Sequence, residues 1–141
     1  SLAGTLPILL GDPTKLTTAE RQSFKAWVDW LKGLENRHAY MSFRQDLTGF
    51  GEPTEGNWDG FMRINTETKS GGLVGVFRQG GAETERTITV KYLDFSKKYA
   101  IKEGNTGKLI STMTGKQLEE TGFKVTLLKK YDSKLFEILV K

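Results

Sequence analysis

The sequence predicts a mainly β fold: an antiparallel Greek-key-type β-sandwich of about seven or eight strands with one N-terminal amphipathic α-helix. Two observations predict it. Residues 46–141 hold about seven short segments of alternating apolar and polar residues, separated by glycine-containing turns at spacings of roughly 8–15 residues. Residues 1–45 have a different pattern, which is that of a strand, a loop and a helix. We therefore expect two parts, 1–45 and 46–141.

The helix is predicted over about residues 18–34. Thr17 with Glu20 three residues later forms the pattern of a capping box, which begins helices. Gly33 and Asn36 are expected to end the helix. One apolar face is made by residues at helical spacing, which are Phe24, Trp27, Val28, Leu31 and Leu34. We expect the tryptophans of this helix to pack in a core.

A short apolar run precedes the helix. Leu6-Pro7-Ile8-Leu9-Leu10 is apolar on both faces and predicts a buried strand, with Pro7 at its start because proline cannot donate to a strand ladder. Gly11-Asp12-Pro13 ends the run.

The strands of the second part follow from period-two alternation. Turns are expected at Ser70-Gly71-Gly72 and Gly80-Gly81, a helical turn at 114–120, and a linker at 46–57. The predicted strands are 61–66, 73–77, 86–93, 99–101, 109–110, 123–128 and 135–140.

The composition excludes several kinds of site. The chain has 141 residues, no cysteine and one histidine, which excludes disulfides, thiol catalysis and cysteine- or histidine-rich metal sites, so we expect no cofactor and no metal. The net charge is +4, and charges of both signs alternate along the chain. This pattern favours a solvated surface over a nucleic-acid-binding face, although a nucleic-acid-binding barrel is the alternative. There is no apolar run long enough to span a membrane and no signal-peptide pattern.

Catalytic constellations are also missing. His38 is the single histidine, and a surface or interface position is its favoured interpretation. The carboxylate pairs Glu52/Glu55 and Glu83/Glu85 lie in polar, glycine-rich stretches that resemble loops, where a general acid with a raised pKa is not expected. The sequence predicts no catalytic residue in this chain.

Aromatic residues are concentrated between the helix and the strands. Tyr40, Phe43, Phe50 and Trp58 lie in a polar stretch that also contains glycine. Aromatic faces in a shallow site can stack on sugars, but the same residues can seal the junction between the two parts of the chain. The junction is the favoured interpretation.

Several segments resemble α-galactosidase-like glycoside hydrolases. Leu6-Pro-Ile-Leu-Leu-Gly-Asp-Pro-Thr-Lys-Leu-Thr17 and the helix after it resemble the last strand, loop and helix of their (β/α)8 barrel. Three segments resemble the crossing from this barrel into the C-terminal antiparallel β-sandwich of these enzymes: His38-Ala-Tyr-Met-Ser-Phe-Arg-Gln-Asp46, Gly49-Phe-Gly-Glu-Pro53 and Trp58-Asp-Gly-Phe-Met-Arg-Ile-Asn65. The segment Gly72-Leu-Val-Gly-Val-Phe-Arg-Gln79 resembles the next strand of that sandwich.

The resemblance implies that the catalytic carboxylates come from middle barrel strands upstream of Ser1, so none is carried over to this chain. Asp12 matches the family's acidic position after the last barrel strand, and strand ends of this kind face the active site. Asp12 is thus a candidate carbohydrate-binding residue, with a hydrogen bond in the loop as the alternative. The other candidates are Tyr40, Phe50 and Trp58.

The resemblance implies a noncatalytic C-terminal domain that braces the barrel of the same parent chain and shapes its substrate cleft. The alternatives are a carbohydrate-binding module and an adhesion or protein-interaction sandwich. Expected partners are the barrel, carbohydrate, and a second copy bound through residues 1–16, but neither nucleic acid nor a membrane. A periplasmic or extracellular location follows if the parent is a secreted bacterial glycosidase.

Overall fold

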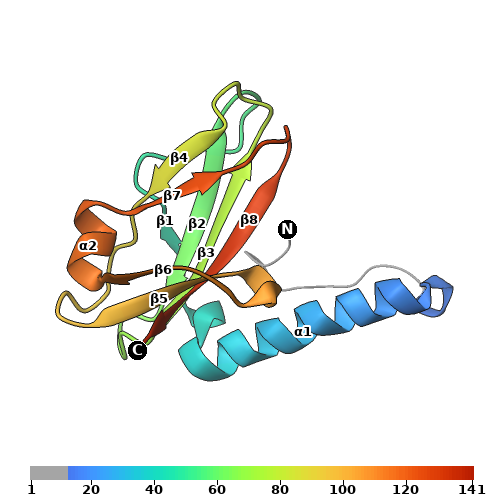
Figure 1. Ribbon diagram of the computed structural model, residues 1–141, viewed down its shortest axis with the longest axis horizontal. Coiled ribbons are helices and arrows are strands. Elements are labelled where there is room, and N and C mark those ends of the chain that lie inside the picture. Colours follow the sequence, from blue (N-terminus) through green and yellow to red (C-terminus); the bar gives the residue numbers. More distant parts are fainter. Residues whose placement is uncertain (1–12) are drawn as a thin grey trace.

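The computed structural model describes residues 13–141 and has a six-stranded and a two-stranded antiparallel sheet (Figure 1). The order in the larger sheet is β1-β2-β3-β8-β5-β6, and β4 pairs with β7 in the smaller one. The predicted mainly β antiparallel fold with one N-terminal helix is confirmed. The elements are α1 (Thr18–His38), β1 (Gln45–Asp46), β2 (Trp58–Ile64), β3 (Gly71–Arg78), β4 (Glu85–Ile88), β5 (Lys98–Glu103), β6 (Lys108–Thr114), α2 (Gly115–Glu120), β7 (Phe123–Thr126) and β8 (Ser133–Val140).

The six-stranded sheet is covered on both faces. Because successive strand residues point to opposite faces, Val74 and Leu73 of β3 belong to different apolar clusters. The larger cluster lies between the two sheets and includes Trp58, Ile88 and Phe123. The smaller cluster, on the face covered by α1, consists of Leu34, Tyr40, Leu73 and Leu135, with Trp30, Leu31 and Phe61 packed against it.

The helix α1 begins as predicted but ends later. Thr17 Oγ1 accepts from the Glu20 amide at 3.2 Å, and the Glu20 carboxylate accepts from the Thr17 amide at 2.8 Å, which completes the capping box. The helix continues past Gly33 to His38, and Ala39 then takes a left-handed conformation with φ 46°. Since Leu34 and His38 are one turn apart and both buried, packing on the sheet carries the helix beyond its predicted end at 34.

Each strand predicted in the second part is present, and the helical turn predicted at 114–120 forms α2. The strand predicted at 86–93 is shorter, because β4 ends at Ile88. Beyond it the Val90 amide donates to the Leu118 carbonyl of α2 at 2.9 Å, and Tyr92 has φ 69°. Contact with α2 therefore ends the strand. The strand predicted at 6–10 lies outside the described residues.

The turn predicted at Gly71 and Gly72 was wrong, because both residues lie inside β3. Their φ angles are +118° and +154°, and an added Cβ would overlap the carbonyl of Ile138 at Gly71 and that of Arg63 at Gly72. Only glycine fits here, since the neighbouring strands approach closely on both sides. The turn between β2 and β3 lies just before, and Lys69 has φ 56° there.

Replacing Gly72 by alanine is expected to lower the free energy of unfolding by about 3 kcal/mol, because the methyl group meets the Arg63 carbonyl in a strained backbone conformation. The matched control is Gly51→Ala, where no atom lies within 4 Å of the added Cβ and the backbone is unstrained, so a change below about 0.5 kcal/mol is expected. Urea unfolding of the two variants measures the difference. Equal stabilities would contradict this account of β3.

Candidate functional site

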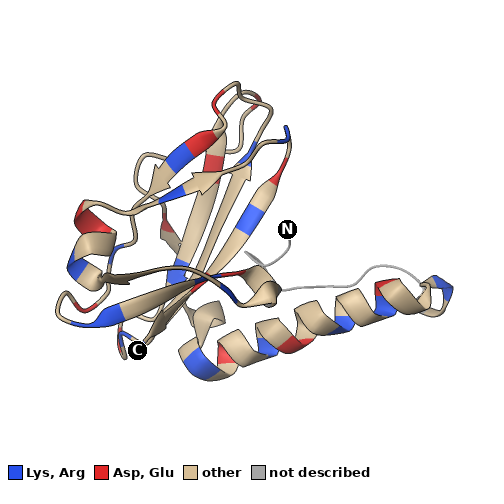
Figure 2. Cartoon of the chain, viewed as in Figure 1, with Lys and Arg blue, Asp and Glu red and all other residues tan. Residues whose placement is uncertain are grey.

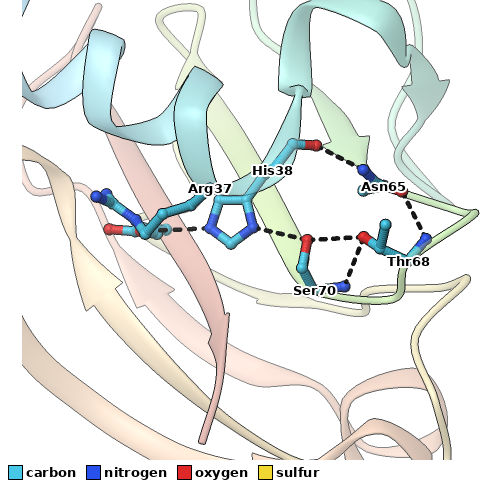
Figure 3. A network of polar contacts seen from close by, with 6 residues as sticks. Arg37, His38, Asn65, Thr68 and Ser70 are labelled. Atoms are coloured by element: carbon cyan, nitrogen blue, oxygen red, sulfur yellow. Dashed lines mark hydrogen bonds and ion pairs between the residues drawn. The ribbon is translucent and has the colours of Figure 1, made fainter.

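A network of polar side chains fixes the C-terminal end of α1 to the centre of the large sheet (Figure 3). Glu137 of β8 accepts a hydrogen bond from Arg37 Nε at 2.7 Å, and His38 Nε2 lies 3.2 Å from the same oxygen. Since a carboxylate only accepts, Nε2 of the imidazole donates. The other ring nitrogen, Nδ1, lies 3.1 Å from Ser70 Oγ. The ring of His38 thus links the sheet to the turn between β2 and β3.

The same turn holds the main chain at the end of α1. The Asn65 side-chain amide donates to the His38 carbonyl at 2.9 Å, and its oxygen accepts from the amides of Glu67 at 3.0 Å and Thr68 at 2.8 Å. Thr68 Oγ1 donates to Ser70 Oγ at 3.1 Å, which closes the network (Figure 3). Hydrogen bonds therefore join the end of α1 to the turn between β2 and β3.

The electrostatics of Glu137 reflect this arrangement. Burial of the carboxyl by itself raises its pKa, but the hydrogen bonds from His38 and Arg37 and their charges outweigh burial and hold the pKa of Glu137 below its ordinary value. The carboxyl is therefore ionised at neutral pH. The side chain is 6% exposed, so its charge is compensated inside the fold.

Arg63 fixes the segment after α1. Its guanidinium is buried and donates to the carbonyls of Met41 at 3.2 Å and Phe43 at 2.9 Å. These carbonyls belong to the stretch that leads from the helix into β1, so Arg63 sets the direction in which the chain enters the sheet.

The N-terminal half of α1 extends past the sheet edge (Figure 1). Its apolar face is exposed: Phe24 is 41% and Trp27 37% exposed, in contrast to Leu34 at 0%. The rings of Trp27 and Trp30 meet edge to face with centroids 5.4 Å apart. The Trp30 indole N–H is buried and has no hydrogen-bond acceptor among residues 13–141. We call Phe24 and Trp27, together with the partly buried Trp30 and Leu31 beside them, the docking face.

A second feature lies on the opposite face of the large sheet, where β4 and β7 pack. A groove of about 420 Å³ opens there, and we call it the β4 groove. Arg86 lies over the Phe50 ring, 5.1 Å from its centroid, and donates to Glu83 at 3.0 Å. The lining residues are Thr48, Gly49, Phe50, Glu83, Glu85, Arg86, Thr87 and Lys124.

The structure does not bring the candidate aromatic residues into one platform. Tyr40 is 1% exposed in the cluster beneath α1, and Trp58 is 2% exposed in the cluster on the opposite face. Trp58 Nε1 donates to the Glu83 carbonyl at 3.0 Å, so its indole lies behind the β4 groove, which Phe50 lines. Tyr40 and Trp58 present no free ring face to a sugar. Asp12 lies outside the described residues.

Sequence reasoning missed the charged residues that hold the site together. Glu137 and Arg63 each stand within an apolar stretch of a strand, flanked by Phe136 and Ile138 or by Met62 and Ile64. A charged residue in such a run is a signal of burial, and a buried charge requires a partner. The sequence thus indicates that Glu137 and Arg63 are buried, but it does not identify the residues that pair with them.

Residues 13–141 hold no group of three or more His, Cys, Asp or Glu side chains placed to bind a metal ion. No helix in this part of the chain is long and apolar enough to cross a membrane. Basic and acidic residues are interspersed along α1 (Figure 2). The charges on this helix thus form the mixed surface that the sequence predicts.

No protein-family model and no curated protein matches the chain. Solved structures do. The GH36 α-galactosidases AgaA and AgaB from Geobacillus stearothermophilus match with TM-scores of 0.71 and 0.67 at 23% and 25% identity, each over 92% of this chain and 17% of theirs. The α-galactosidase from Lactobacillus brevis matches with a TM-score of 0.72 at 15% identity, over 92% of this chain and 18% of its own.

The chain therefore spans about a sixth of the length of the α-galactosidases that it matches. At these identities the likeness is one of fold. The resemblance to α-galactosidase-like glycoside hydrolases that the sequence predicts is confirmed at that level.

Replacing Glu137 by glutamine is expected to change how stability depends on pH. The folded pKa of Glu137 lies below its ordinary value of 4.5, so the carboxylate stabilises the fold at neutral pH and this contribution is lost as the pH falls below 4.5. The variant should lose about 1–3 kcal/mol at neutral pH and show a shallower decline in acid.

Thermal unfolding from about pH 7 to about pH 3 measures both effects. The control is Glu120→Gln, a 61% exposed carboxylate 3.9 Å from Lys116, whose removal should change stability by less than about 0.5 kcal/mol. An unchanged acid slope in Glu137→Gln would show that the buried carboxylate does not stabilise the helix end.

Proposed function

We propose that this chain is a noncatalytic C-terminal β-sandwich domain of a glycoside hydrolase that braces the catalytic (β/α)8 barrel of the same parent chain. The observation that carries the proposal is the docking face. The apolar face of α1 runs on from the buried Leu34 to Phe24 and Trp27, which are exposed although they lie on the same side of the helix. A helix with such a face buries it against another element.

The polar network at the other end of α1 supports this role. Arg37 and His38 on Glu137, together with Asn65 on the His38 carbonyl, fix one end of the helix to the sheet. A helix fixed at one end and projecting at the other holds its free apolar face in a defined direction. Such an arrangement suits rigid attachment of one domain to another.

The comparisons favour a barrel as the occupant of the docking face. More than four fifths of each matching α-galactosidase chain lies outside the matched region. In the family that the sequence resembles, the helix at this position belongs to the barrel.

Catalysis by the parent enzyme depends, in this proposal, on carboxylates upstream of Ser1. Shaping of the substrate cleft by Asp12, self-association through residues 1–16 and the division of the chain at residue 45 remain predictions from the sequence.

Phe24→Ala is expected to have different effects in two contexts. In the 141-residue chain the loss of free energy should stay below about 0.5 kcal/mol, because Phe24 is 41% exposed and alanine is the better helix former. In the longer chain encoded from further upstream, the same change should cost about 3 kcal/mol, because the ring is then buried against the barrel. Denaturant unfolding of both chains measures the two costs.

The control is Leu34→Ala, which removes a fully buried side chain and should cost about 3 kcal/mol in both contexts. The longer chain should also hydrolyse p-nitrophenyl α-galactoside, whereas the 141-residue chain should not. An equal, small cost of Phe24→Ala in both chains, or an upstream sequence without alternating strands and helices, would contradict the proposal.

A further inference from the structure

We propose that the β4 groove is a saccharide-binding site, separate from the docking face. It is lined by two carboxylates, two cations, two threonine side chains and one aromatic ring. Its volume of about 420 Å³ lies in the range of pockets that hold small molecules. The choice of a galactose-containing probe rests on the proposed function, whereas the argument for the groove does not.

The balance of charge in the groove selects the class of ligand. Glu83 and Glu85 offset Arg86 and Lys124, so the lining carries no formal net charge. The hydrogen bonds from Lys124 and Thr126 lower the pKa of Glu85, which keeps it ionised at neutral pH. A phosphate or a nucleic acid would be attracted by the two cations but repelled by the two carboxylates. A positively charged ligand would be attracted by the carboxylates but repelled by the cations. A neutral ligand meets neither penalty.

The hydrogen-bonding groups suit a polyhydroxylated ligand. Each sugar hydroxyl both donates and accepts, so it needs acceptors and donors side by side. The Glu85 carboxylate and the Lys124 ammonium lie 3.2 Å apart on neighbouring strands. The Glu83 carboxylate accepts a hydrogen bond from the Arg86 guanidinium at 3.0 Å. Each pair therefore presents an acceptor beside a donor.

The part of the groove around Phe50 is held by the core. Phe50 packs against the large apolar cluster, and the Arg86 guanidinium covers its outer face while donating to the Gly49 carbonyl at 3.3 Å. From behind, the buried indole of Trp58 holds the Glu83 carbonyl at 3.0 Å. The guanidinium is a flat group on which the C–H face of a sugar ring can lie, while the rim of the groove binds the hydroxyls.

Two-dimensional ¹H–¹⁵N NMR titration of the 141-residue chain with raffinose tests the site. We expect amide shifts confined to residues 48–50, 83–87 and 124, with a dissociation constant on the order of 1 mM. Arg86→Ala should weaken binding at least about tenfold, because it removes a charged hydrogen-bonding group. The control Arg21→Ala, which removes an exposed arginine of α1, should leave binding unchanged.

A second variant covers the case in which loss of Arg86 loosens the loop that carries Phe50. Thr87 is exposed on β4, so Thr87→Trp fills the groove without breaking an ion pair and should abolish binding while the thermal unfolding midpoint is retained.

Three results would overturn the proposal: no shifts at about 100 mM raffinose, tighter binding of inorganic phosphate than of raffinose, or binding retained in Thr87→Trp. None of them bears on the Phe24 comparison, because the groove and α1 lie on opposite faces of the large sheet.

Discussion

The position of α1 depends on one carboxylate. Glu137 stands in β8, between β3 and β5 in the large sheet, and accepts from both Arg37 and His38 at the end of the helix. A buried charge of this kind tolerates few arrangements, because each alternative leaves the carboxylate without donors. Arg37 also stands in the last turn of the helix, where the helix dipole favours positive charge. The contacts of Glu137 therefore fix both the attachment of the end of α1 to the sheet and the direction in which the helix runs.

The alternation of side chains along the strands separates two surfaces. In β8, Leu135 and Glu137 face α1, while Phe136 and Ile138 face β4 and β7. The docking face and the β4 groove are therefore built on opposite sides of one sheet. Each can change by substitution without direct contact with the other.

Local patterns were sufficient to predict most of the secondary structure. The alternation around Val125 and Ile138 identified β7 and β8, and Thr17 with Glu20 marked the beginning of α1, because these signals lie within a few residues of each other. The errors have a common cause. The end of α1 and the role of Gly71 depend on neighbouring segments that are distant in sequence, and those neighbours override local propensity.

The candidate site was less predictable for the same reason. His38 and Glu137 are 99 residues apart in sequence, so no spacing rule pairs them. The aromatic residues between helix and strands are neighbours in the sequence, but Tyr40 and Trp58 lie in different apolar clusters. Of these residues only Phe50 lines the β4 groove, because Gly49 and the Leu47 carbonyl turn the chain there.

The two halves of α1 differ in what stabilises them. The projecting half is held by the capping box and by an exposed pair between Lys25 and Asp29 at 2.5 Å, which are local interactions. The half near His38 is held by the core. Amide hydrogens around Phe24 should therefore exchange through local fraying on a much faster timescale than those around Leu34, which require opening of the whole domain. The helix is thus held cooperatively by the core near His38, whereas its N-terminal end frays locally.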